Sequence, residues 1–226
     1  MSVSGSDGVS VSVMKGDSVT LHTDVEINQQ EKIHWYFNDI RIAYINEDLS
    51  NSCTDVQCNE GTERFRDRLK LDHQTGSLTI TNTRTTDSGE YKLEIIKGNE
   101  SETIFRVTVI GVSAAERDEI CVKEGESVTL DPDVMKNTND SMTWYFNDTL
   151  IAEITEDQCK IGTDDQCEER FRNTLEVNQT GSLIITNSRT TDSGLYQLQI
   201  INSRFSIIRS FSVTVTVPEV RIQMLQ

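Results

Sequence analysis

The sequence is poor in basic residues, in histidine and in long apolar runs. It has 21 Lys and Arg against 37 Asp and Glu, a formal net charge of −16, and 3 histidines. Such a chain repels phosphate backbones and anionic lipid head groups, so we expect no nucleic-acid partner and no direct membrane binding by this fragment. It has no run of about 18 consecutive apolar residues, and we therefore expect no membrane-spanning helix within it.

The chain begins Met1-Ser-Val-Ser-Gly5, without the charged and apolar blocks of a secretory signal. If the protein is extracellular, the sequence is a trimmed fragment.

One pattern occurs twice along the chain. Trp35-Tyr-Phe-Asn-Asp39 returns as Trp144-Tyr-Phe-Asn-Asp148, and Asp87-Ser-Gly-Glu-Tyr91 returns as Asp192-Ser-Gly-Leu-Tyr196. Each copy takes about half of the chain, which predicts a tandem pair of domains and not a solenoid.

Apolar and polar residues alternate within each copy, as Val19 and Leu21 do with Ser18 and Thr20. A period of two is typical of half-buried strands, and no long helical pattern competes with it. Many short strands with one apolar face predict two sheets packed face to face. We therefore predict an all-β fold, with one β-sandwich over 1–110, a second over 111–217, and the start of a stalk or of a following domain at 218–226.

These motifs resemble the immunoglobulin superfamily, in particular its variable-type (V-set) domains. In that family a tryptophan lies on strand C, the place of Trp35 and Trp144, and an Asp-x-Gly-x-Tyr corner precedes strand F, as at 87–91 and 192–196. The interval between tryptophan and corner leaves room for the extra C′ and C″ strands of a V-type sheet. The repeated phrase Gln-Thr-Gly-Ser-Leu-x-Ile-Thr-Asn further resembles SLAM-type leukocyte receptors of the multigene kind found in bony fishes.

The disulfide that joins the two sheets in this family is missing. Its two positions hold Thr23 and Leu93 in the first copy and Pro132 and Leu198 in the second. Both domains therefore forgo roughly 2–5 kcal/mol of stabilisation, and we expect the leucines to fill the space as ordinary core. Since proline has no N–H to give to a ladder, we expect a bulge or an interrupted strand B at Pro132.

The resemblance also implies one ion pair in each domain. V-set domains pair the arginine that opens strand D with the aspartate of the corner. Here the Arg-Phe motifs at 64–65 and 170–171 imply the pairs Arg64–Asp87 and Arg170–Asp192.

The cysteines are Cys53, Cys58, Cys121, Cys159 and Cys167. The first two and the last two lie at matching places in the repeats, which favours local disulfides Cys53–Cys58 and Cys159–Cys167, each contributing about 2 kcal/mol at most. A zinc site would need four ligands within reach, and the two pairs lie in separate domains without a histidine pattern nearby. We expect no metal and no cofactor. Cys121 is left over, and two interpretations stay open: a tolerated thiol, or a bridge that forms a homodimer.

The acceptor motifs for N-glycosylation are unevenly distributed. Three of the four lie in the second domain, one of them at its C–C′ turn, whereas Ile40 removes the acceptor from the matching turn of the first domain. A glycan is bulky and would shield the second domain there, leaving the first bare. This favours the flat face of the first domain as a contact surface. The acceptors are Asn99, Asn139, Asn147 and Asn178.

No catalytic pattern stands out, and we expect the protein not to be an enzyme. The histidines are His22, His34 and His73. The resemblance implies that His22 lies on strand B and His34 on strand C, in opposite sheets, and strand alternation points both outward, so they cannot share a metal or a substrate. A nucleophile elbow, an HExxH motif and a phosphate-binding glycine loop are all missing from the sequence.

The resemblance implies that the GFCC′ face of the first domain makes cell–cell contacts. Aromatic residues flanked by charges of both signs suit that use. We therefore predict the ectodomain of a cell-surface immune or adhesion receptor, the extracellular portion of a single-pass plasma-membrane protein. Its partner would be another cell-surface protein, a second copy of the chain or a related immunoglobulin-family receptor. The alternative is a structural spacer in a longer receptor. The predicted face comprises His34, Tyr36, Arg41, Tyr44, Lys92, Glu94, Ile96, Ile104 and Arg106.

Overall fold

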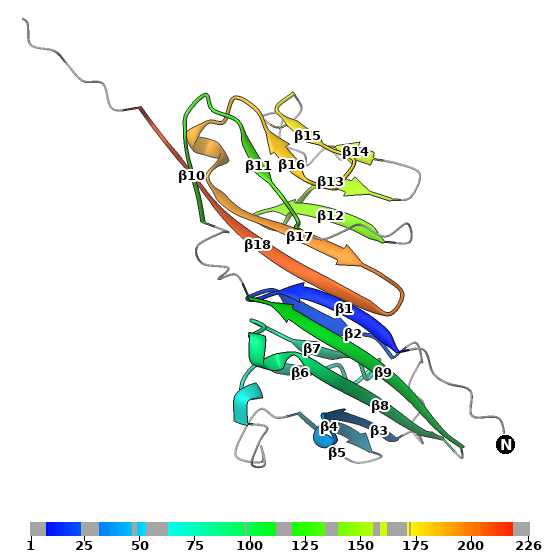
Figure 1. Ribbon diagram of the computed structural model, residues 1–226. Helices are drawn as coiled ribbons and strands as arrows, with labels where there is room; N and C mark the ends of the chain where they lie inside the picture. The colour runs from blue at the N-terminus through cyan, green and yellow to red at the C-terminus, as the bar shows by residue number, and fades with distance from the viewer. Residues whose placement is uncertain are drawn as a thin grey trace, which may run out of the picture. The chain divides into compact units, whose positions relative to one another are not determined.

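Two compact all-β units make up the chain, as the sequence predicts (Figure 1). The first comprises residues 1–114 with 201–208, and the second comprises 115–200 with 209–226. Apart from turns and short 3-10 helices, the described residues form strands, and none of their helices is long and apolar enough to cross a membrane. The computed structural model describes residues 8–23, 32–46, 49–52, 63–97, 99–111, 119–133, 140–155, 159–161, 171 and 173–218.

The larger sheet of the first unit has the order β1-β9-β8-β3-β4-β5. β1 runs parallel to β9, and the other neighbours are antiparallel. The strands β4 and β5 are the two extra strands that the sequence predicts before strand D. The bounds are β1 Val9–Met14, β3 Lys32–Phe37, β4 Ile40–Asn46, β5 Leu49–Ser52, β8 Gly89–Lys97 and β9 Asn99–Ile110.

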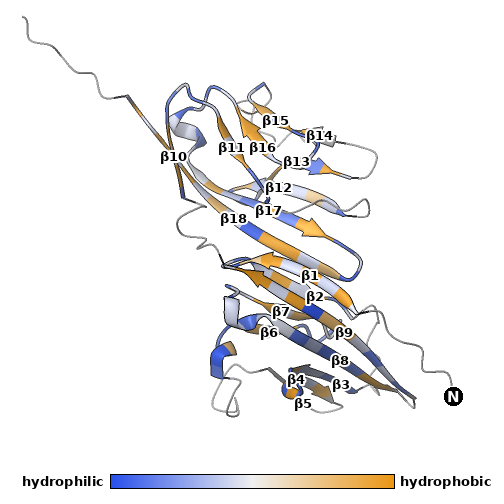
Figure 2. Ribbon diagram, viewed as in Figure 1, coloured by the Kyte–Doolittle hydropathy of each residue, from blue (hydrophilic) through white to orange (hydrophobic). Residues whose placement is uncertain are grey.

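The second sheet of this unit has the order β2-β7-β6, with bounds Ser18–Leu21, Leu78–Ile80 and Leu69–Leu71. The edge of β2 that does not pair with β7 pairs with Phe205–Ile208. These residues are the part of β18 (Phe205–Thr216) that belongs to the first unit. Buried and accessible residues alternate along the strands, and Figure 2 shows this as alternating hydropathy. The core therefore contains the predicted apolar positions.

The second unit repeats this plan. One sheet has the order β14-β13-β12-β17-β18 with β10 parallel to β18, and the other has the order β11-β16-β15. The bounds are β10 Glu119–Lys123, β11 Val128–Leu130, β12 Ser141–Phe146, β13 Thr149–Ile154, β14 Cys159–Ile161, β15 Leu175–Val177, β16 Leu183–Ile185 and β17 Gly194–Ile201.

The strand expected to be interrupted at Pro132 does end early, at Leu130. However, β2 ends at Leu21, the matching residue of the first unit, although no proline follows there. The proline is therefore not what ends the strand. Pro132 is buried, and its carbonyl accepts a hydrogen bond from Nη1 of Arg209.

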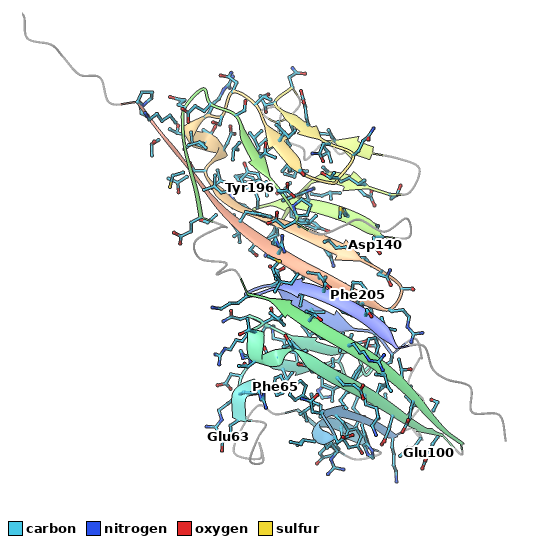
Figure 3. All side chains as sticks on the ribbon, viewed as in Figure 1. Glu63, Phe65, Glu100, Asp140, Tyr196 and Phe205 are labelled. Atoms are coloured by element: carbon cyan, nitrogen blue, oxygen red, sulfur yellow. The ribbon has the colours of Figure 1, made fainter. Side chains whose placement is uncertain are left out.

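Each core is held by the same two side-chain hydrogen bonds. The indole N–H groups of Trp35 and Trp144 donate to the carbonyls of Gly76 and Gly181, at 2.8 and 2.9 Å. The hydroxyls of Tyr91 and Tyr196 donate to the backbone carbonyl four residues earlier, both at 2.8 Å. Both tyrosines are buried (Figure 3 labels Tyr196), and burial raises the pKa of Tyr91 far above its ordinary value. The corner motif thus performs the same task twice.

The ion pair of the first unit involves a different arginine from the predicted one. Asp87 is fully buried, and both its oxygens are held by Arg68, with Nη1–Oδ2 at 2.6 Å and Nη2–Oδ1 at 2.9 Å. The Nη1 of Arg64 instead donates to the carbonyl of Thr86. The prediction of an Arg64–Asp87 pair is therefore wrong, because the buried arginine four residues later occupies that place.

Several other predictions fall outside the described residues, and they stay predictions. The Cys53–Cys58 and Cys159–Cys167 bridges, the Arg170–Asp192 pair and the acceptors Asn99 and Asn139 all involve residues, or side chains, outside that part of the chain. Cys121 is exposed and forms no disulfide.

Candidate functional site

The strands β3, β4, β8 and β9 bring the predicted face together. His34 lies opposite Tyr44 on one neighbouring strand and opposite Glu94 on the other. Tyr36 lies opposite Arg41 and Lys92, and Lys92 in turn lies opposite Ile104. We call this surface the front face. It is formed by His34, Tyr36, Arg41, Tyr44, Lys92, Glu94, Ile96, Ile104 and Arg106.

A β-bulge explains how both Arg41 and Tyr44 reach the front face. The register of β3 against β4 shifts between Trp35 and Tyr36, and the consecutive residues 42 and 43 are both buried. The extra residue reverses the alternation, so that residues three apart point the same way. Simple alternation along β4 could not have placed both of them.

Glu94 is the centre of the polar contacts on the front face. Its carboxylate lies 2.9 Å from Nζ of Lys92 and 3.8 Å from Nδ1 of His34. It is also close enough to Tyr36 to raise the pKa of that phenol. Three side chains from two strands therefore converge on one carboxylate.

Lys92 joins this centre to the aromatic residues. Its Nζ lies 4.8 Å from the ring centroid of Tyr36, within cation–π range, and 3.7 Å from Oε1 of Glu102. Glu94 and Glu102 are directly opposite across β8 and β9, a like-charge pair that the lysine between them compensates. At the margin, the guanidinium of Arg41 lies 5.0 Å from the ring of Tyr44.

Two acidic residues of this surface were not predicted. Glu102 contacts Lys92, and Glu90 lies 3.7 Å from Nη2 of Arg106. Each of them points to the same side of its strand as the predicted residues of that strand. The alternation that would have identified them is therefore present in the sequence.

The electrostatics of the face follow from these contacts. Partial burial, assisted by Arg41, lowers the pKa of His34 below 6.5 although Glu94 opposes this shift. Burial and then Glu94 raise the pKa of Tyr36. Burial alone would raise the pKa of Glu94, but the hydrogen bonds from Lys92 and Tyr36 outweigh it and the pKa falls. The hydrogen bond with Glu94 is also the main reason that the pKa of Lys92 rises.

We expect Glu94→Gln to lower the pKa values of both His34 and Tyr36, because the carboxylate raises each of them in the folded chain. The histidine pKa can be measured by NMR titration. Since the pKa of His34 is already below 6.5, its contribution to stability is present above that pH and lost as the pH falls through the lower folded value. Glu90→Gln is the matched control and should leave the pKa of His34 unchanged. If Glu94→Gln also leaves the pKa of His34 unchanged, the contact between Glu94 and His34 is contradicted.

Two family models match the sequence. The immunoglobulin V-set domain matches residues 116–218, and the immunoglobulin domain matches residues 2–95. The chain belongs to the immunoglobulin superfamily. It is a tandem pair, as the repeat predicts; the likeness to SLAM-type receptors of bony fishes stays a prediction.

The chain is similar to several solved immunoglobulin structures. The first Ig-like domain of human CD48 antigen is 24% identical, with a TM-score of 0.40, over 49% of this chain and 88% of that one. The Ig1-2 module of the Drosophila receptor protein tyrosine phosphatase DLAR is 16% identical, with a TM-score of 0.40, over 92% and 95%. The CD2-binding domain of CD58 is 14% identical, with a TM-score of 0.37, over 94% and 99%. No curated protein sequence matches the chain.

The second immunoglobulin domain shows what the fold itself requires on this sheet. It repeats the bulge, between Trp144 and Tyr145, and it keeps Tyr145 where the first domain has Tyr36. The charged network is not repeated. The second domain has Thr143 in place of His34, Leu150 in place of Arg41, Glu153 in place of Tyr44 and Leu195 in place of Glu90. It has Gln197 in place of Lys92, Gln199 in place of Glu94 and Ser212 in place of Arg106.

The C–C′ turns of the two immunoglobulin domains are alike except for the acceptor motif. The side-chain oxygens of Asn38 and Asn147 accept hydrogen bonds from the backbone N–H groups of Glu90 and Leu195, at 3.0 and 3.1 Å. Asn147 is exposed, as is Asn178 in the turn after β15. A glycan on the amide nitrogen of Asn147 would leave its oxygen bonded to the backbone, so the turn can accept this modification.

No cluster on the described residues resembles a metal centre. His34 lies in β3, and His22 follows β2 of the other sheet. The front face therefore offers charges, hydrogen bonds and aromatic rings for contact with another surface.

Proposed function

We propose that this chain is the ectodomain of a cell-surface immune or adhesion receptor, and that its first domain binds another cell-surface protein through the front face. The protein would be the extracellular portion of a single-pass membrane protein. The partner would be a second copy or a related immunoglobulin-family receptor.

The observation that carries the proposal is the difference between the two domains. Both have the same sheet, bulge and turn, so whatever the fold needs is present in each. Among the residues that the structure describes, only the first domain has linked charges on that sheet, those of His34, Lys92, Glu94 and Glu102. Because the second domain forms the same sheet with Gln197 and Gln199 at the matching positions, the fold does not require these charges, which supports a role in binding.

The charge balance of the front face also suits a protein partner. Lys92, Arg41 and Arg106 are offset by Glu90, Glu94 and Glu102, within a chain whose net charge is −16. A locally balanced surface avoids the long-range repulsion between acidic proteins, while its charges select the partner and the tyrosines anchor the contact. Weak single contacts would be multiplied by avidity between membranes.

The test compares matched tyrosines. Beads that carry many copies of the chain are mixed with each other and with leukocytes, and their adhesion is measured by flow cytometry. We expect Tyr36→Arg to reduce adhesion at least about tenfold, the size of effect that buried tyrosine anchors have. Tyr145→Arg, the same change on the second domain, should leave adhesion intact.

The outcomes separate the proposal from its alternative. Adhesion that resists Tyr36→Arg would contradict a role for the front face. Beads that bind neither each other nor any cell would favour the spacer interpretation. Bead–bead adhesion would identify the partner as a second copy, and cell binding alone would identify a different receptor.

A further inference from the structure

The strand β10 has one edge, here called the open edge, that no other described strand covers. It pairs with β18 from Glu119 to Lys123, and within the described part of the chain no strand pairs with its other edge (Figure 1). The N–H of Glu124 donates to the carbonyl of Thr216 on β18, whereas the N–H of Lys123 points away from β18, to Oε2 of Glu126 at 2.9 Å. Successive residues of a strand present their backbone groups to opposite edges. Glu119 and Cys121 therefore present theirs to the open edge.

The sequence of β10 is complementary to itself. If two copies of Glu-Ile-Cys-Val-Lys run antiparallel about their central residue, Glu119 faces Lys123 of the second copy and Ile120 faces Val122 of the second copy. Opposite charges and β-branched residues are favourable cross-strand pairs. Both charged residues are exposed, so they are available for such pairing. Because the arrangement is symmetric, each favourable pair occurs twice.

We propose that the open edge of β10 docks a second copy of this chain, antiparallel and centred on Cys121. This surface is distinct from the front face, and the inference does not depend on the proposed function. In the docked pair, the N–H of Lys123 donates to a backbone carbonyl of the second copy instead of to the Glu126 carboxylate. In the undocked chain the Glu126 carboxylate covers this edge, as charged side chains commonly do at open strands.

The register places the two Cys121 residues directly opposite each other. A hydrogen-bonded antiparallel pair has Cα atoms about 5.5 Å apart, and disulfides span Cα distances of about 4.4–6.8 Å. The exposed thiol can therefore form a disulfide with its symmetry mate. With oxidised glutathione as the oxidant, the Cys121 S–S bond forms as the glutathione S–S bond breaks. The two thiol protons end on two molecules of reduced glutathione.

The experiment measures the rate at which the reduced, folded full chain forms a covalent dimer in oxidised glutathione, on non-reducing gels. Mass spectrometry of the peptides should identify Cys121–Cys121, and Cys121→Ser should form no covalent dimer. Glu119→Lys places like charges opposite each other twice and should slow the reaction about tenfold. The double change Glu119→Lys with Lys123→Glu restores opposite charges and should restore the rate.

Glu176→Lys is the matched control, since it makes the same charge change at an exposed position of β15. It should leave the rate near that of the unchanged chain. The proposal is overturned if Glu119→Lys is no slower than Glu176→Lys, or if the double change fails to restore the rate. It is also overturned if Cys121 yields only a mixed disulfide with glutathione.

Discussion

Replacing Arg68 by alanine is expected to lower the free energy of unfolding of the first domain by about 3–5 kcal/mol, the cost of leaving a buried charge without its partner. Asp87 has no exposed surface, and Arg68 contacts both of its oxygens, at 2.6 and 2.9 Å. The carboxylate also accepts from the backbone N–H of Arg84, so it cannot turn away without breaking the corner. Hydrogen-exchange mass spectrometry in rising urea measures the effect, with β12 and β16 of the second domain as an internal reference.

Arg64→Ala is the control that separates the two arginines. Arg64 is exposed and donates to the carbonyl of Thr86, so its loss should cost less than about 1 kcal/mol. A double change of Arg68 and Asp87 to alanine should cost less than the sum of the two single changes, because the interaction is then removed only once. If Arg64→Ala lowers the free energy of unfolding as much as Arg68→Ala does, the assignment of the ion pair to Arg68 is wrong.

The sequence analysis predicted Arg64 because the Arg-Phe motif identifies only the arginine directly before the phenylalanine. In the folded chain, Arg64 lies in the 3-10 helix η1 (Glu63–Phe65), and its guanidinium lies 5.0 Å from the ring of Phe37. Asp67 then adopts a left-handed conformation, with φ at 60°, directly before Arg68. That local turn precedes the arginine that reaches the interior, and nothing in the spacing of charged residues reveals it. In the second domain Thr174 occupies the place of Arg68.

Much of the fold could be predicted, because alternation and the corner motif depend on local chemistry. Tyr91 and Tyr196 make the same hydrogen bond in both domains, and the alternation of residues such as Val19 and Leu21 marks the buried side of β2. The front face was harder to predict. Its β8 residues follow directly from alternation, whereas the placement of Arg41 and Tyr44 depends on a bulge between β3 and β4. The contacts of Glu94 depend on register between strands, which a single sequence does not contain.

Replacing Arg209 by alanine is expected to lower the free energy of unfolding of the second domain by about 3 kcal/mol, from a lost charged hydrogen bond and the cavity left behind. Arg209 is 2% exposed, and it points inward from β18 between Ile207 and Phe211. Its Nη1 donates to the carbonyl of Pro132, at the position where the family has the strand-B cysteine. The guanidinium therefore supplies a polar link between the two sheets of a domain that has no disulfide there. The first domain has Thr103 at the matching position.

Arg209→Met separates the hydrogen bond from the packing, since methionine fills similar space without donors. If the link between the sheets contributes to stability, this variant should still lose about 1.5 kcal/mol, measured by urea unfolding with hydrogen exchange on β17 and β11. Ser210→Ala, at the exposed neighbour on β18, should change stability by less than about 0.5 kcal/mol. If the methionine variant is as stable as the unchanged chain, Arg209 contributes to stability only by packing. The free-energy cost of burying the guanidinium would then equal the contribution of its hydrogen bond.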